Sequence, residues 1–195
     1  EKGSETDKAV LLKSIELYGG DQTNIIPAVS TDWYKELLRT AQMQNHALDI
    51  TGGSDKVAYS VGLNYLFQEG IMDAVNDYER FNIRAKSDYF VSDWLKIGAN
   101  LISSNVTKRD PNNFAWESAF IAPPIFPVYD ENNTAAYPEK FASPAQVGYS
   151  TYFGNPVATA YYNNAKSNIR QFLPTFYAEL YLLPQNRLTF KTSYN

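Results

Sequence analysis

The stretch Lys56 to Gln68, KVAYSVGLNYLFQ, alternates between two kinds of side chain almost without exception. Its odd positions are apolar or aromatic, and its even positions, apart from Leu66, are small or polar. Because successive residues of a β-strand point to opposite faces, a period of two predicts a strand with one apolar and one polar face. The apolar set consists of Val57, Tyr59, Val61, Leu63, Tyr65 and Phe67.

The length of this predicted strand indicates which environment it occupies. Ordinary strands run about five or six residues, whereas this alternation keeps its phase for about eleven. At about 3.3 Å per residue and a tilt of about 40°, such a strand rises about 28 Å, close to the apolar band of about 25 Å on an outer-membrane barrel. The stretch is therefore long enough to cross a membrane.

The same alternation recurs in later segments. In YERFNIRAKSDY, which starts at Tyr78, the polar positions include Arg80, Arg84 and Lys86, and Lys96 takes the equivalent place on the next segment. If the apolar faces meet lipid, these basic side chains point into the lumen of a barrel. The plainer interpretation is that any lumen wall is polar and charged, and a role in substrate binding is the alternative.

The connections between the segments alternate between short and long. TGGSD (Thr51 to Asp55) and LPQNR (Leu183 to Arg187) contain hairpin residues, whereas EGIMDAVND (Glu69 to Asp77) is longer and the stretch 106–165 is longer still. Short periplasmic turns and long extracellular loops describe a transmembrane barrel. We therefore predict a partial antiparallel barrel over 46–195, with about six strands and a long extracellular loop at about 106–165.

Two local features modify this outline. Residues 1–45 read as a surface connection with short helices, because ETDKAVLLKSIELYGG ends at the helix-stop signal Gly19-Gly20 and STDWYKELLRT offers polar caps at its start. Farther along, Pro174 cannot donate a ladder hydrogen bond, so we expect a strand that begins properly at Thr175 or a bulge or edge position before it.

Composition excludes several classes of protein. The chain has 195 residues, 44% of them hydrophobic and 15% aromatic, with a formal net charge of -4 and no cysteine. No apolar run reaches the length of about 18 residues that a membrane-spanning helix needs. The mild acidity argues against a nucleic-acid partner, for which a basic patch is expected, and the lack of cysteine excludes disulfides and thiolate metal sites.

No constellation for catalysis or metal binding is found. His46 is the only histidine and has no partnered Ser or Cys motif. The acidic pair Asp130-Glu131 lacks the spacing of a calcium-binding EF-hand loop. We therefore predict that the protein is not an enzyme and has no cofactor and no metal site.

Five short motifs carry a family resemblance. They are TDWYKELLRTA (Thr31 to Ala41), TGGSDK (Thr51 to Lys56), YLFQEGI (Tyr65 to Ile71), YERFNIR (Tyr78 to Arg84) and DWLKIGANL (Asp93 to Leu101). Together, in this order and spacing, they resemble the early barrel region of the SusC/RagA family of TonB-dependent outer-membrane transporters. The match is close over residues 31–101.

The resemblance implies a fold, a location and partners. Members of this family have a 22-stranded barrel in the outer membrane of Gram-negative bacteria, closed by a plug domain. They import oligosaccharides or peptides together with a SusD-like surface lipoprotein, and the TonB complex acts through the plug. This chain, which starts with Glu1 inside the pattern, is expected to be a piece of a longer protein and to lack the plug.

The long loop holds the candidate ligand-binding residues. Its aromatic side chains among Asn and Asp residues suit stacking on sugar faces or packing against a lid protein. These candidates are Phe114, Trp116, Phe126, Tyr129 and Tyr137. The alternative is that they fold the loop onto itself. A second aromatic segment, Ser143 to Ala165, carries Tyr149, Tyr152, Phe153, Tyr161 and Tyr162, and some of these are expected in an aromatic girdle at the membrane interface instead.

The sequence also fits two other functions. A soluble all-β carbohydrate-binding module would use the same odd faces as its core, and it predicts strands shorter than about eight residues. A barrel-anchored surface receptor or adhesin would use the barrel only as an anchor. Uptake that depends on TonB distinguishes a transporter from an adhesin.

Overall fold

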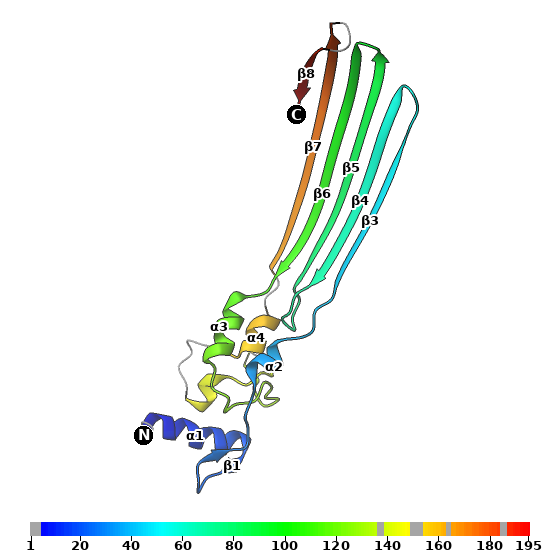
Figure 1. The fold of residues 1–195 in the computed structure, drawn as a ribbon. Helices are drawn as coiled ribbons and strands as arrows, with labels where there is room; N and C mark the ends of the chain where they lie inside the picture. Colours follow the sequence, from blue (N-terminus) through cyan, green and yellow to red (C-terminus); the bar gives the residue numbers. More distant parts are fainter. Residues whose placement is uncertain (1–4, 136–138, 149–153, 163–164, 184–186) are drawn as a thin grey trace. The chain divides into compact units, whose positions relative to one another are not determined.

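The computed structural model describes residues 5–135, 139–148, 154–162, 165–183 and 187–195 (Figure 1). The helices are α1 (Glu5–Tyr18), α2 (Trp33–Leu37), α3 (Asn113–Ile121), the 3-10 helix η1 (Pro144–Val147) and α4 (Pro156–Tyr161). The strands are β1 (Gly20–Asp21), β2 (Ile26–Pro27), β3 (Met43–Gly53), β4 (Val57–Glu69), β5 (Asp77–Ser92), β6 (Leu95–Asp110), β7 (Ala165–Leu182) and β8 (Leu188–Tyr194).

These elements form two compact units that are interleaved along the chain. The helical unit consists of residues 1–41, 70–76 and 109–165, and the strand unit consists of residues 42–69, 77–108 and 166–195. The helical unit thus contains most of the N-terminal segment together with the long connection between β6 and β7. That connection contains α3, η1 and α4.

The strand unit is one antiparallel sheet with the strand order β3-β4-β5-β6-β7-β8. Each strand is therefore hydrogen-bonded to its neighbours in sequence, which is the topology of an up-and-down barrel wall. The strands are long, with 13 residues in β4, 16 in β5 and in β6, and 18 in β7. This confirms the predicted sheet of about six long antiparallel strands.

The register separates the side chains of the sheet onto two faces. Leu63 of β4 lies opposite Leu48 of β3 and Ile83 of β5, while Gly62 lies opposite Asp49 and Arg84. Because opposed residues point to the same side, we define two faces on β3, β4 and β5. The apolar face carries Leu48, Ile50, Tyr59, Val61, Leu63, Tyr65, Phe81, Ile83 and Tyr89. The polar face carries Asp49, Ser60, Gly62, Asn64, Arg80, Asn82, Arg84, Lys86 and Asp88.

Strand β7 runs from Ala165 to Leu182 and includes Pro174. Of the two expected alternatives, a start at Thr175 is wrong, and a bulge or edge position around Pro174 remains. The described register of β7 with β8 covers only Phe176 to Leu182, so Pro174 lies beyond that pairing. Its missing N–H is tolerated there because a proline can occupy a position where one side of the strand is unpaired.

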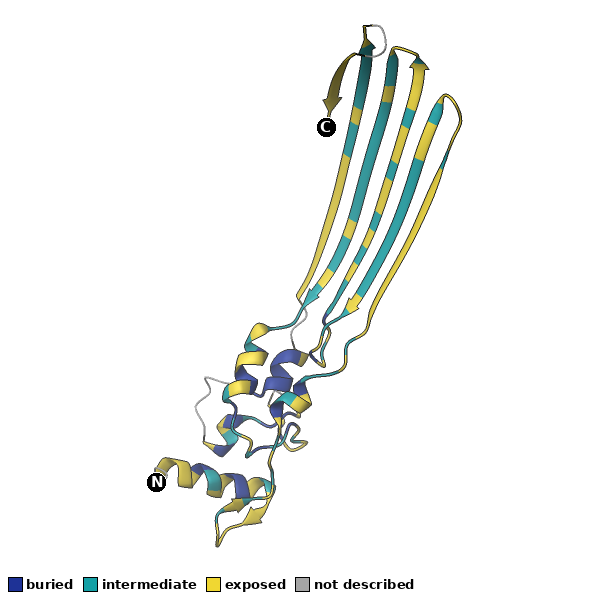
Figure 2. Ribbon diagram, viewed as in Figure 1, coloured by how far each residue is buried: buried dark blue, intermediate teal, exposed yellow. Residues whose placement is uncertain are grey.

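The helical unit has a core of its own. Its central contact is between Trp33 of α2 and Phe126, whose ring centroids are 4.9 Å apart, and Phe126 is fully buried. Small alanines of α3 and α4 pack around this pair. Figure 2 shows buried residues among the helices and their connections, whereas the strands are intermediate or exposed. Every hydrophobic residue of the described chain that is classed as buried belongs to the helical unit.

The end of α1 and the start of α2 lie where the sequence signals predict them. Gly19 has a φ of 89° and donates its N–H to Ile15 at 2.9 Å, so it terminates α1 in the left-handed conformation that favours glycine. Asp32 caps α2 by accepting a hydrogen bond from the Lys35 N–H at 3.2 Å. The predicted short helices near the N-terminus are thus confirmed.

Candidate functional site

The polar face carries a charged network that connects β5 to β8. Glu179 of β7 pairs with Lys96 of β6 at 2.5 Å and with Lys191 of β8 at 2.8 Å. The Tyr177 hydroxyl donates a hydrogen bond to the Asp88 carboxylate, and the Lys191 ammonium lies 4.7 Å from the centre of the Tyr177 ring. Charges of both signs therefore neutralise each other within this part of the sheet.

A glycine makes the reach of Tyr177 possible. Gly98 of β6 lies between β7 and β5, and a Cβ atom at this position would collide with the Tyr177 ring. The phenol can therefore extend across β6 to Asp88, which also pairs with Lys86 at 3.3 Å. Two of the predicted lumen-facing cations, Lys86 and Lys96, belong to this network.

The other two predicted cations line a separate depression on the same face. Arg80 and Arg84 contribute to a space of about 470 Å³ together with Asp49, Ser104 and Gln171. Within the part of the chain that the structure describes, the buried Nε of Arg80 has no hydrogen-bond acceptor. All four basic side chains thus lie on one face of the sheet, as the alternation predicts, but in two different surroundings.

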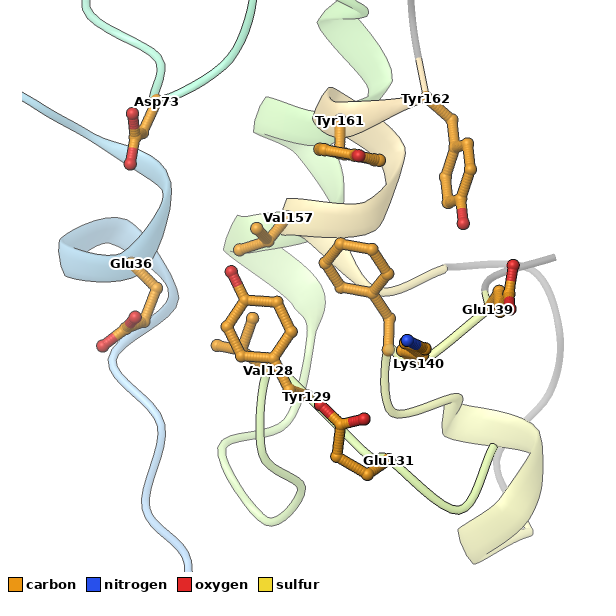
Figure 3. A pocket seen from close by; sticks show the side chains of 11 residues that line it. Glu36, Asp73, Val128, Tyr129, Glu131, Glu139, Lys140, Val157, Tyr161 and Tyr162 are labelled. Atoms are coloured by element: carbon orange, nitrogen blue, oxygen red, sulfur yellow. The ribbon is translucent and has the colours of Figure 1, made fainter. Parts of the chain in front are cut away.

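The helical unit contains a larger cavity, of about 610 Å³ (Figure 3). Four aromatic rings line it and contact one another around Phe141. The ring centroid of Phe141 lies 5.2 Å from that of Tyr129, 5.6 Å from that of Tyr161 and 6.0 Å from that of Tyr162. Phe141 is buried, whereas Tyr129 is 61% and Tyr161 67% exposed, so tyrosine rings form the accessible part of this surface.

Acidic side chains surround these rings. Glu36 of α2, Asp73, Glu131 and Glu139 line the cavity, with Lys140 as the single basic lining residue in the described chain. Figure 3 shows Glu36 and Asp73 on one side of the space and Glu131 on another. Asp73 has a partner outside the lining, the guanidinium of Arg39 at 3.7 Å. The arrangement can stack a flat or cationic group on tyrosine faces while carboxylates accept its hydrogen bonds.

Backbone pairing and one buried amide fix the aromatic residues in place. Tyr129 and Phe141 form an antiparallel bridge. The Asn155 side chain donates to the carbonyls of Val128 and Ala142 at 2.8 and 3.0 Å, which ties the two sides of this bridge together. The Asn155 Oδ1 also accepts from two N–H groups at the start of α4, the helix that carries Tyr161. One asparagine therefore links three parts of the cavity wall.

A second set of contacts holds the segment that follows Tyr129. The Asp130 carboxylate accepts from the Tyr18 hydroxyl at 3.4 Å and from the Gln146 amide at 3.2 Å. Burial and the neighbouring Asp130 carboxylate raise the pKa of Tyr18 to about 12. The phenol of α1 thus remains protonated at neutral pH and can donate to Asp130.

The structure separates the aromatic residues that the sequence grouped as ligand candidates. Tyr129 lines the cavity. Phe126 is buried in the core against Trp33, and Trp116 packs edge-on against Tyr34 at 5.3 Å. Phe114 lies in the first turn of α3, where its N–H is capped by Asn112 at 3.0 Å. Tyr137, Tyr149, Tyr152 and Phe153 lie outside the described residues. The alternative, in which aromatics fold the loop onto itself, fits Phe126.

Several cavity residues were not candidates from sequence. Phe141, Glu36 and Asp73 come from segments that are distant in the chain, and although Glu36 lies in the motif TDWYKELLRTA, that motif indicated the family and not a cavity. Tyr161 was noted only as an aromatic of a second segment. A period of three to four residues in Pro156–Tyr161 could not have identified it, because that helix is short and its other side chains are buried.

Side chains able to bind a metal ion are scattered over the described residues. These residues contain no group of three or more His, Cys, Asp and Glu side chains that could hold a metal ion. His46 lies on β3 with its ring centroid 6.4 Å from that of Tyr65. None of the helices in the described ranges has the length and apolar character needed to cross a membrane.

A sheet of long strands with one apolar and one polar face is typical of an outer-membrane β-barrel. The curated relatives are TonB-dependent receptors, which agrees with this class. The chain is 29% identical over 151 residues to TonB-dependent receptor P26 of Formosa agariphila, covering 77% of this chain. It is 34% identical over 79 residues to receptor P3 of the same organism, covering 40% of this chain. It is 27% identical over 143 residues to TonB-dependent receptor SusC of Bacteroides thetaiotaomicron, covering 72% of this chain. No family model matches the chain.

Solved structures show the same fold. The RagAB peptide importer in its closed-closed state matches 93% of this chain at 21% identity, with a TM-score of 0.64. A second structure of the RagAB peptide transporter matches 97% with a TM-score of 0.65. The predicted resemblance to TonB-dependent receptors of the SusC/RagA type is therefore confirmed. The chain spans only 8 to 14% of the curated relatives and 22% of each matched structure.

Proposed function

We propose that this chain is part of an outer-membrane TonB-dependent importer in a Gram-negative bacterium. In this proposal the strand unit belongs to the wall of a 22-stranded barrel, and the helical unit belongs to its extracellular loops. The apolar face meets lipid, and the polar face with Arg80, Arg84, Lys86 and Lys96 meets the lumen. The energy for import comes from the TonB complex acting on a plug domain that is not among these residues.

One observation carries this proposal: the long strands have one apolar and one polar face. Strands of 13 to 18 residues rise more than about 30 Å at a tilt of about 40°, which exceeds the apolar band of about 25 Å. Large apolar side chains on the apolar face, such as Leu48, Ile50 and Phe81, are at least 40% exposed. A soluble module predicts shorter strands with these side chains in a core.

We further propose that the substrate is an oligosaccharide or a peptide and that a SusD-like surface lipoprotein is the partner. The similarity to SusC and to the RagAB peptide importer supports this proposal. The aromatic cavity with Tyr129 is the candidate contact for either of them. No catalytic step is required of the chain, which agrees with relatives that are receptors and transporters.

Uptake in cells tests the proposal. A strain that produces the full-length protein should accumulate a fluorescent oligosaccharide or peptide library, and deletion of either the gene or tonB should abolish accumulation. The protein itself should be recovered in the outer-membrane fraction. Surface binding that persists without uptake, and that does not change on deletion of tonB, would instead favour the receptor or adhesin alternative.

A further inference from the structure

We propose that the cavity of the helical unit binds a cationic group, namely the guanidinium or ammonium of a basic side chain in a peptide substrate. The inference rests on the proposed import function and assigns a substrate class to one site of it. The cavity, of about 610 Å³, is large enough for a side chain with the backbone that carries it.

The aromatic lining supplies the first argument. Tyr129, Tyr161 and Tyr162 are 61%, 67% and 42% exposed, although each packs against at least one other ring. Aromatic side chains that only filled a core would turn their faces inward, as Phe141 does at 6% exposure. The exposed tyrosine faces attract cations through their ring quadrupole, and they also accept flat guanidinium groups.

The charge of the lining supplies the second argument. Carboxylates of Glu36, Asp73, Glu131 and Glu139 outnumber the one lining cation, Lys140. They still outnumber the cations when Arg39, the partner of Asp73, is included. A negative site lined by tyrosine faces favours a cation over a neutral ligand of the same shape, and it repels sulfated or carboxylated glycans.

The rigidity of the site supplies the third argument. Tyr129 and Phe141 are paired through the backbone, and the buried Asn155 amide joins their segments to α4, as described above. Asn155 is only 1% exposed, so water does not compete for these hydrogen bonds. A site that is already ordered loses little conformational freedom when a ligand enters, which favours affinity.

Two peptides that differ only in charge provide the test. The probes are acetyl-Gly-Arg-Gly-amide and acetyl-Gly-citrulline-Gly-amide, because citrulline keeps the shape of arginine without its charge. Isothermal titration of the purified full-length importer at low salt should show about tenfold tighter binding of the arginine peptide, a preference that decreases as salt screens the carboxylates. Equal affinities, or no binding of either peptide, would overturn the inference.

Matched variants locate the binding. Tyr129→Ala and Glu131→Gln should each weaken the arginine peptide several-fold, and both side chains are exposed, so folding is preserved. Phe120→Ala and Glu117→Gln, exposed positions of α3 that do not line the cavity, should leave affinity unchanged. Binding that is insensitive to Tyr129→Ala and Glu131→Gln would place the cation elsewhere and refute the assignment.

The result of the peptide-binding test can be distinguished from the result of the uptake test. If TonB-dependent uptake of a neutral oligosaccharide proceeds while the two peptides bind equally, the cavity inference fails and the importer proposal stands. If the arginine peptide binds selectively but no uptake depends on TonB, the cavity inference stands and the importer proposal fails.

Discussion

The strand unit and the helical unit place their hydrophobic side chains in opposite ways. In the helical unit, Trp33, Leu37 and Phe126 are at most 4% exposed and form a core that excludes water. In the strand unit, Ile50, Phe81 and Phe176 remain 40 to 54% exposed on a continuous sheet face. The helical unit removes its apolar side chains from water by itself. The apolar face of the sheet is removed from water only if its surroundings are apolar. The difference supports the proposal that the sheet meets lipid while the helical unit meets water.

Polar groups follow the same division. The helical unit ties buried amides such as Asn155 to backbone carbonyls, as water-soluble domains do. The strand unit instead collects its charges on one face and pairs Glu179 with Lys96 and Lys191 across neighbouring strands. Charged side chains in a membrane-spanning sheet are tolerated when they face a polar interior. The polar face therefore fits a hydrated lumen.

The largest effect is expected from damage to the core of the helical unit. Phe126→Ala removes a fully buried ring that packs on Trp33 and should lower the local free energy of unfolding by about 3–5 kcal/mol. Hydrogen exchange of α2 and α3 amides in the full-length protein should accelerate about a hundredfold or more. Phe120→Ala, at a side chain 78% exposed, is the control. Equal protection in both variants would contradict a self-contained core.

A slightly smaller effect is expected from a charge on the apolar face. Ile83→Arg, near the middle of β5, should cost about 2–4 kcal/mol, because arginine would face the lipid core. The folded fraction of the full-length barrel, measured by its heat-modifiable migration on a gel, should fall. Asn82→Arg places an arginine at the adjacent position, which belongs to the polar face, and should be tolerated. If Asn82→Arg is as harmful as Ile83→Arg, the two faces are not distinct environments.

The smallest effect concerns the link between α1 and Asp130. The pKa of Tyr18 is raised to about 12 in the folded protein, so its stabilising contribution is fully present below pH 10, the ordinary value, and is lost as pH rises toward 12. Tyr18→Phe should cost about 0.5–1.5 kcal/mol at neutral pH. Hydrogen exchange of α1 measured at pH 7 in the two proteins checks this. No difference between them would show that the hydroxyl contributes nothing.

Sequence periodicity predicts the strand unit well for a physical reason. Alternation is a local property, so Tyr59 to Tyr65 determine the two faces of β4 without knowledge of the rest of the chain. The opposed pairs Leu63–Ile83 and Gly62–Arg84 follow because a slip by one residue would exchange the faces. The ends of the strands are less local, and β7 continues through Pro174 to Ala165 because its neighbour β6 also extends, to Asp110.

The cavity could not be predicted in the same way. It brings Glu36, Asp73 and Tyr129 together from three separated segments, and Asn155 acts on the carbonyls of Val128 and Ala142. None of these contacts has a sequence period. The aromatic content of the loop therefore indicated a ligand surface but could not separate Tyr129, which lines the cavity, from Phe126, which supports the core.

The environments proposed for the two faces of the sheet are tested most directly by labels on adjacent residues of β5. The 195 residues contain no cysteine, so Ile83→Cys and Arg84→Cys each introduce a single site into this part of the protein for an environment-sensitive fluorophore. In the full-length protein in lipid vesicles, we expect the label at 83 to be quenched by brominated lipid and the label at 84 by aqueous iodide. Iodide quenching at both positions, or the reverse pattern, would contradict the proposed environments.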